Sequence, residues 1–224
     1  MTDDRGVSEV LSFVLVFALV ISTIVIVYAL GYPALLHVQD VERSNNAERA
    51  MTAIADTTTE ITVRGAPSRA TEVKLSEASL SFGAPTTVTV RNDTGGVVAT
   101  STFRPLVYDG ADGTRLVYAG GGVFREQADG GFVVVRDPEL VVAGSDTVIL
   151  VPATTPMAST DAIAGQSDVL VRLERGDVTT VSTTGNVSVD VTADAPEAWH
   201  ALLESTHVSD RSSVTVVEVR IELE

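Results

Sequence analysis

The sequence predicts an α+β protein: an N-terminal transmembrane helix continues into a stalk helix, and an antiparallel all-β sandwich-like domain with one short helix follows. Three observations lead to this prediction. An uncharged, mostly apolar run extends from Val10 to Leu36. A stripe of apolar residues at steps of three and four lies beyond it, and from about Thr71 apolar residues alternate with polar ones. These patterns are typical of a membrane span, an amphipathic helix and β-strands, respectively.

The membrane span is assigned first. About 20 apolar residues, at a rise of 1.5 Å each, cross the hydrocarbon core of a bilayer, and Val10 to Ala29 alone meets this length. Tyr28 and Tyr32 lie where aromatic residues are enriched at the membrane surface. We expect Pro33, which follows Gly31, to kink or interrupt the helix there. The transmembrane helix is therefore expected to end at about residue 31.

The predicted stalk helix occupies residues 32–66. One face of it carries Ala47, Ala50, Met51, Ile54, Thr58 and Ile61. This face can pack on the following domain or on other stalks in a filament, and periodicity alone does not separate the two. The sequence Gly65-Ala66-Pro67 is expected to end the helix.

Residues 67–224 are predicted to form the β-rich domain. Strand-like runs recur, and turn-forming pairs such as Asp109-Gly110 and Asp112-Gly113 separate them. The runs are centred on Val73, Leu80, Val88, Phe132, Val148, Val169, Val187 and Val214. One short helix is expected at Glu197 to Leu203, where Trp199, Leu202 and Leu203 would dock it on a sheet.

Composition excludes several classes of function. Asp and Glu number 30 against 15 Lys and Arg, which gives a formal net charge of -15. The clustered cations that bind phosphate are absent, so no nucleic-acid partner is expected. Without cysteine there is no disulfide, thiolate metal site or thiol nucleophile. Such an acidic surface, with Lys74 as the only lysine, resembles those of proteins from salt-loving archaea.

A short polar cluster precedes the apolar run. It reads Arg5-Gly6-Val7-Ser8-Glu9, whereas an ordinary secretory signal has a shorter apolar core followed by a small-residue cleavage site. The cluster and the run resemble the class III signal of archaeal type IV pilins and pilin-like proteins. The resemblance covers about the first 30 to 40 residues. It implies cleavage by a prepilin peptidase between Gly6 and Val7, with Arg5 in the recognition sequence.

The resemblance also implies a leader of residues 1–6, a transmembrane helix of residues 7–31 and a set of partners. Because the chain after the apolar run is long and acidic and contains two glycosylation-type triplets, the short N-terminus is expected to be cytoplasmic and the C-terminal domain extracellular, on a single-pass membrane protein. Membrane lipid, the prepilin peptidase and other pilin subunits, through the N-terminal helix, are the expected partners. Ser8 and Glu9 would belong to the assembly and membrane segment. Glu9 is third after the proposed cut, where bacterial pilins place an acid fifth; it can neutralise the new amine or remain hydrated at headgroup level.

The sequence contains few residues suited to catalysis. His37, His200 and His207 lack the spacing of a metal site. Asp109 and Asp112 fit a hairpin turn better than a calcium loop, and Gly120-Gly121-Gly122 predicts a turn or bulge. No enzymatic activity, metal or cofactor is therefore expected. The expected function is adhesion or surface display in a pilus-like filament, and the alternative is a membrane-anchored binding module that does not polymerise.

Two triplets match the acceptor pattern for N-linked glycosylation: Asn92-Asp93-Thr94 and Asn186-Val187-Ser188. Asn92 lies in a predicted turn, whereas Asn186 opens a predicted strand. Asn92 is therefore the better candidate.

Overall fold

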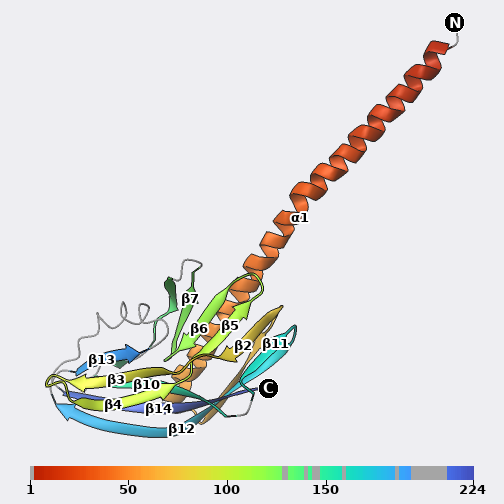
Figure 1. Cartoon of the computed structure of the whole chain (residues 1–224). Coiled ribbons are helices and arrows are strands. Elements are labelled where there is room, and N and C mark those ends of the chain that lie inside the picture. Colours follow the sequence, from red (N-terminus) through yellow and green to blue (C-terminus); the bar gives the residue numbers. More distant parts are fainter. Residues whose placement is uncertain are drawn as a thin grey trace. The chain divides into compact units, whose positions relative to one another are not determined.

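The computed structural model of the chain describes residues 3–127, 131–138, 141–142, 147–157, 160–184, 187–192 and 211–224. Among these residues there is one helix, α1 (Asp3–Thr62), and the remaining regular structure is β-strand (Figure 1). The chain divides into two compact units, residues 1–43 and residues 44–224. The first unit is helical, and the second contains the last turns of α1 and all of the strands.

The strands form three sheets. Their bounds are β1 (Ser68–Lys74), β2 (Ala78–Phe82), β3 (Thr86–Asn92), β4 (Val97–Phe103), β5 (Leu106–Gly110), β6 (Arg115–Ala119), β7 (Gly122–Glu126), β8 (Phe132–Arg136), β9 (Val141–Val142), β10 (Thr147–Pro156), β11 (Ala162–Gly165), β12 (Asp168–Thr184), β13 (Val187–Thr192) and β14 (Arg211–Leu223). The strand orders are β1-β12-β14-β10-β9, β11-β2-β5-β6-β7-β8 and β13-β3-β4.

This arrangement confirms the predicted α+β class with sandwich-like antiparallel sheets. One pair departs from the antiparallel rule: β10 and β14 run parallel, from Thr147 opposite Ser212 to Pro156 opposite Ile221. Parallel neighbours need a long crossover connection, and here three further strands lie between the two in the sequence. Alternation within a strand does not reveal the direction of its neighbour, so the sequence pattern could not indicate this pair.

Glycine residues build the tight turns between strands. Between β6 and β7, Gly120 and Gly121 both have positive φ angles, of 57° and 84°. Two consecutive residues with positive φ are the mark of the two-residue hairpin turns that match the twist of a β-ribbon. The turn predicted at Gly120 to Gly122 is therefore confirmed, and it places Tyr118 and Val123 opposite each other.

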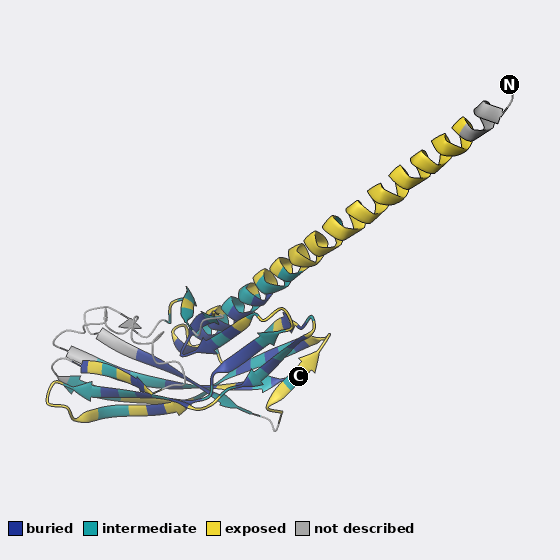
Figure 2. Cartoon of the chain, turned by 45° about the horizontal axis from the view of Figure 1, so that its top comes forward, coloured by how far each residue is buried: buried dark blue, intermediate teal, exposed yellow. Residues whose placement is uncertain are grey.

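The end of α1 packs on the sheets of the second unit. Ala47, Met51, Ile54, Thr58 and Ile61 are buried, and the apolar members of this set share one core with residues of the sheets (Figure 2). The residues in that core from the sheets include Leu75, Leu80, Leu106, Leu116, Tyr118 and Leu173. This confirms that the predicted helical stripe packs on the domain. A second core, around Val90, Phe103, Phe124 and Val214, lies elsewhere in the β-domain.

The interruption expected at Pro33 is wrong, because α1 continues through Pro33. A proline inside a helix removes one backbone hydrogen bond, to the carbonyl four residues earlier. Apolar helices tolerate this loss because the rest of the backbone has no better partner than its own helix. The helix instead ends at Thr62, where the Ala66 N–H donates to the Glu60 carbonyl over 3.0 Å and Gly65 has a φ of 73°. The predicted stop at Gly65 to Pro67 is thus confirmed.

Candidate functional site

Among the described residues, the most extensive exposed apolar surface is the apolar part of α1 in the first unit. Its large side chains are exposed, with values of 70% for Phe13, 68% for Leu19 and 72% for Leu30 (Figure 2). Its most apolar window has a mean hydropathy of 3.1 and no residue buried inside the protein. An apolar surface of this extent is not stable in water. The segment is long and apolar enough to span a membrane, which is consistent with single-pass anchoring.

Polar groups within this segment fit an apolar environment. The Thr23 hydroxyl donates to the Leu19 carbonyl over 2.8 Å, so it has a partner without water. Tyr28 and Tyr32 stack with ring centroids 5.6 Å apart. Both tyrosines lie near the C-terminal end of the uncharged run. If they lie at the membrane surface, as predicted, their hydroxyls are within reach of water.

The predicted processing residues lie at the start of α1. Arg5, Gly6 and Val7 are in its first turns, and Ser8 and Glu9 follow with exposed side chains. Helical backbone continues from these residues into the apolar run without a break. Cleavage between Gly6 and Val7 would leave the run at the N-terminus of the mature chain.

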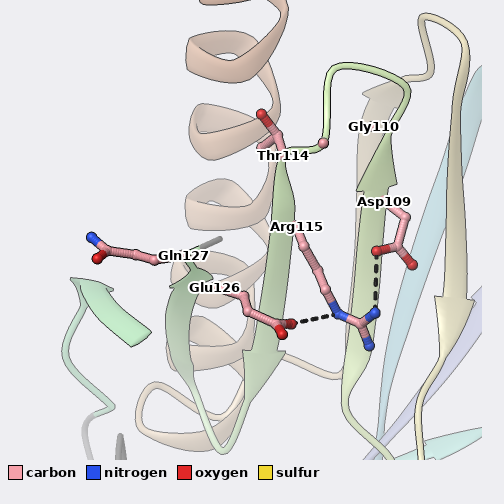
Figure 3. Close-up of a pocket in the computed structure, with 7 residues that line it drawn as sticks. Asp109, Gly110, Thr114, Arg115, Glu126 and Gln127 are labelled. Carbon is pink, nitrogen blue, oxygen red and sulfur yellow. Dashed lines mark ion pairs between the residues drawn. The ribbon is translucent and has the colours of Figure 1, made fainter. Parts of the chain in front are cut away.

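A polar recess of about 340 Å³ lies at one end of the β5-β6-β7 sheet (Figure 3). Arg115 of β6 occupies its centre and forms ion pairs with Asp109 of β5, at 3.5 Å, and Glu126 of β7, at 2.9 Å. The remaining lining residues are Gly110, Gly113, Thr114 and Gln127. All three charged side chains are partly exposed, so each pair contributes at most about 1 kcal/mol. The recess presents one cation whose charge two carboxylates more than balance.

Asp112 next to this recess stabilises a turn. Its carboxylate accepts the Thr114 N–H over 3.0 Å and the Thr114 hydroxyl over 2.9 Å. This agrees with the hairpin interpretation of Asp109 and Asp112. Across the described parts of the chain, no group of three or more His, Asp and Glu residues could hold a metal ion.

Sequence analysis missed Arg115 and Glu126 as partners of Asp109. The register brings them together, because Asp109 lies opposite Arg115 and Arg115 lies opposite Glu126. The turn signals at Asp112-Gly113 and Gly120-Gly121 fix both hairpins. Pairing the strands outward from these turns could have found the cluster.

Polar contacts hold the last turns of α1 against the β-domain. The Thr58 hydroxyl donates to the Ile54 carbonyl over 3.0 Å. Because this uses its only hydrogen, the Tyr118 hydroxyl is the donor in the 2.6 Å contact between Thr58 and Tyr118. Arg136 of β8 forms an ion pair with Asp56 at 2.9 Å and donates to the Gly121 carbonyl over 2.9 Å. Helix, strand and turn are therefore connected through buried groups at Thr58 and Tyr118 and through a more exposed ion pair at Asp56.

Tyr118 gives this connection a pH dependence. Burial disfavours the phenolate and raises the pKa of Tyr118 to about 12, although the positive charge of Arg136 acts in the opposite direction. The pKa of Tyr118 is higher in the folded protein than the ordinary value of 10.0. The neutral phenol therefore stabilises the folded state fully below pH 10. We expect stability to fall by up to about 3 kcal/mol as the pH rises from 10 towards 12, measured by urea unfolding of the detergent-solubilised protein.

Tyr118→Phe provides the matched control for this titration. It keeps the ring and removes the ionisable group, so the variant is expected to lose much of the pH dependence between pH 10 and 12. It also removes the 2.6 Å contact with the Thr58 hydroxyl, which lowers stability at neutral pH by about 1 kcal/mol. An unchanged alkaline profile in the variant would show that Tyr118 does not titrate with folding.

The other candidate residues are placed as follows. Asn92 ends β3 at the hairpin to β4, and His37 is exposed on α1. Asn186, His200, His207 and the helix expected around Trp199 lie outside the described residues.

The fold and the exposed apolar run define an α+β protein with one N-terminal helix able to span a membrane. The chain belongs to the family described as "Family of unknown function (DUF7289)", whose model matches residues 5–223. Searches of the curated proteins and of the solved structures each found no match.

Proposed function

We propose that this chain is a pilin-like, membrane-anchored surface protein, exported through a class III signal and displaying its β-domain outside the cell for adhesion or assembly into a type IV pilus-like filament. The observation that carries this proposal is the exposed, uncharged run of α1 directly behind Arg5-Gly6. Lipid is the environment that suits this run. The remaining partners are the prepilin peptidase and, in a filament, other subunits.

The junction between anchor and domain supports a role in surface display. The last turns of α1 belong to the core of the β-domain, with Met51, Ile54 and Ile61 fully buried. The membrane segment is therefore joined to the displayed domain by a helix that cannot leave it without exposing that core. This property suits both a filament subunit and an adhesin.

Replacing Gly6 tests the processing step. In proteins with this type of signal, the residue before the cut is small, and we expect Gly6→Leu to block cleavage. The variant should keep residues 1–6, which intact-mass measurement of the protein from native membranes resolves as a heavier chain. Gly31→Leu is the matched control, because nothing lies within 4 Å of a Cβ at Gly31 and the change is away from the cut. Equal masses for wild type and Gly6→Leu would contradict cleavage after Gly6.

The polar recess favours a second candidate, a membrane-anchored binding module that does not polymerise. Arg115 with its two carboxylates offers donors and acceptors for a polar ligand such as a carbohydrate. Crosslinking in intact cells separates the candidates. A ladder of crosslinked multimers that contain this chain supports the filament, whereas a single monomer band, with no protein released by shearing, supports the binding module.

A further inference from the structure

One glycosylation triplet is presented by a tight hairpin. Asn92 is the last residue of β3, and Asp93 and Thr94 lie exposed in the turn to β4. The backbone closes the turn twice: Asn92 N–H donates to the Gly96 carbonyl and Gly95 N–H to the Asn92 carbonyl, each over 2.9 Å. Gly95 adopts a φ of 80°, which glycine tolerates best. The second and third residues of the triplet therefore lie outside both strands.

The carboxamide of Asn92 has a defined orientation in this turn. Its Oδ1 accepts the Gly96 N–H over 2.7 Å and the Thr94 hydroxyl over 2.8 Å. A backbone N–H can only donate, so this contact fixes which end of the carboxamide is oxygen. Within the described residues, no acceptor is hydrogen-bonded to Nδ2. N-linked glycosylation takes place on Nδ2, and the hydrogen bonds of the turn use Oδ1 instead.

Glycine at position 96 makes this arrangement possible. A Cβ at Gly96 would lie 3.1 Å from Oδ1 and 3.2 Å from Nδ2 of Asn92. A residue with a side chain at position 96 would therefore crowd both the oxygen and the nitrogen of the Asn92 carboxamide. Glycine at position 96 therefore leaves the space beside the carboxamide unfilled while its N–H holds the amide oxygen.

We propose that Asn92 is the acceptor of an N-linked glycan, transferred from a lipid-phosphate-linked oligosaccharide. Nδ2 attacks the anomeric carbon of the sugar and forms the C–N bond, the C–O bond to the lipid phosphate breaks, the lipid phosphate leaves with the electron pair, and Nδ2 loses a proton to a base of the transferase. The two donors to Oδ1 fix the orientation of the carboxamide before Nδ2 reacts. The proposal rests on the proposed function, because this transfer takes place outside the cytoplasm.

The glycan would stand beside an open sheet edge. β4 is an outer strand of the β13-β3-β4 sheet. Its first residue, Val97, is 57% exposed and pairs with Arg91, the neighbour of Asn92. Open edges invite pairing with other strands, and bulky hydrophilic groups prevent it. A sugar at Asn92 would therefore stand next to this edge and hinder its pairing with another strand.

Glycopeptide mass spectrometry of the full-length protein from native membranes tests the proposal. We expect a saccharide mass on the Asn92 peptide in wild type and in Thr94→Ser, which keeps the triplet. The mass should be lost in Asn92→Gln and in Thr94→Ala, which keeps the asparagine. Asn186→Gln is the control and should keep the saccharide on the Asn92 peptide. An Asn92 peptide found only unmodified in wild type would overturn the proposal.

A second measurement separates this failure from failure of the proposed function. The chain has no cysteine, so Glu72→Cys, on an exposed position of β1, provides a unique label site in a different sheet from the hairpin. Labelling of intact cells by a membrane-impermeant maleimide, with Asn92 unmodified, overturns the glycan alone. A cysteine that reacts only after lysis overturns both the extracellular topology and the glycan.

Discussion

Replacing Leu19, Ile21 and Ile24 together by Asp is expected to release the protein from the membrane fraction. All three side chains are exposed and lie within the uncharged run. On insertion scales, exchanging Leu or Ile for Asp near the centre of a membrane helix costs about 3 to 4 kcal/mol each, or roughly 10 kcal/mol in total. This exceeds what the remaining apolar residues can offset. Carbonate extraction of membranes, followed by detection of the chain in pellet and supernatant, measures the effect.

The matched control replaces the same three residues by Ala. Alanine shortens the side chains without adding charge, so this variant should remain in the pellet. Retention of the triple-Asp variant in the pellet after extraction would contradict a membrane role for this segment. Loss of both variants would indicate that specific packing of these side chains, rather than their apolar character, holds the protein in the membrane.

Replacing Ile54 by Ala is expected to lower the free energy of unfolding by about 2 to 5 kcal/mol. Ile54 is fully buried in the core that joins α1 to the sheets. The shorter side chain loses its apolar transfer energy and leaves a cavity that rigid neighbours fill only in part. Urea unfolding of the detergent-solubilised full-length protein, followed by tryptophan fluorescence or circular dichroism, provides the measurement.

Arg49→Ala is the matched control, because Arg49 is exposed on the same helix. A change within about 0.5 kcal/mol is expected there. If Ile54→Ala were as stable as Arg49→Ala, the end of α1 would not be part of the folded core. The stalk would then be free to pack against other subunits instead, which was the alternative that periodicity left open.

Local periodicity was sufficient to predict much of the fold. The spacing of Met51, Ile54 and Ile61 marks one helical face whatever that face contacts, and those residues are buried. Alternation around Val88 and Val169 likewise predicted strands that the structure contains. These predictions succeeded because the residues that a helix or strand buries lie on one of its faces. Apolar residues therefore recur in the sequence with the period of that element.

Features that depend on distant segments could not be predicted in the same way. The parallel pairing of β10 with β14 is decided by which strands become neighbours, and alternation does not encode this choice. Pro33 remains helical because the apolar residues around it offer its backbone no better partners. The Arg115 ion pairs require the register of two hairpins. Composition alone showed only that charged residues were plentiful.

The most direct test of the central claim is the N-terminal sequence of the mature protein from native membranes, with and without the prepilin peptidase gene. A chain that begins at Val7, and that keeps residues 1–6 when the peptidase is absent, is the predicted result. It would establish that the apolar run of α1 serves as signal and as anchor. An N-terminus upstream of Val7 in both strains would contradict the pilin-like route and leave a signal-anchored binding module as the better account.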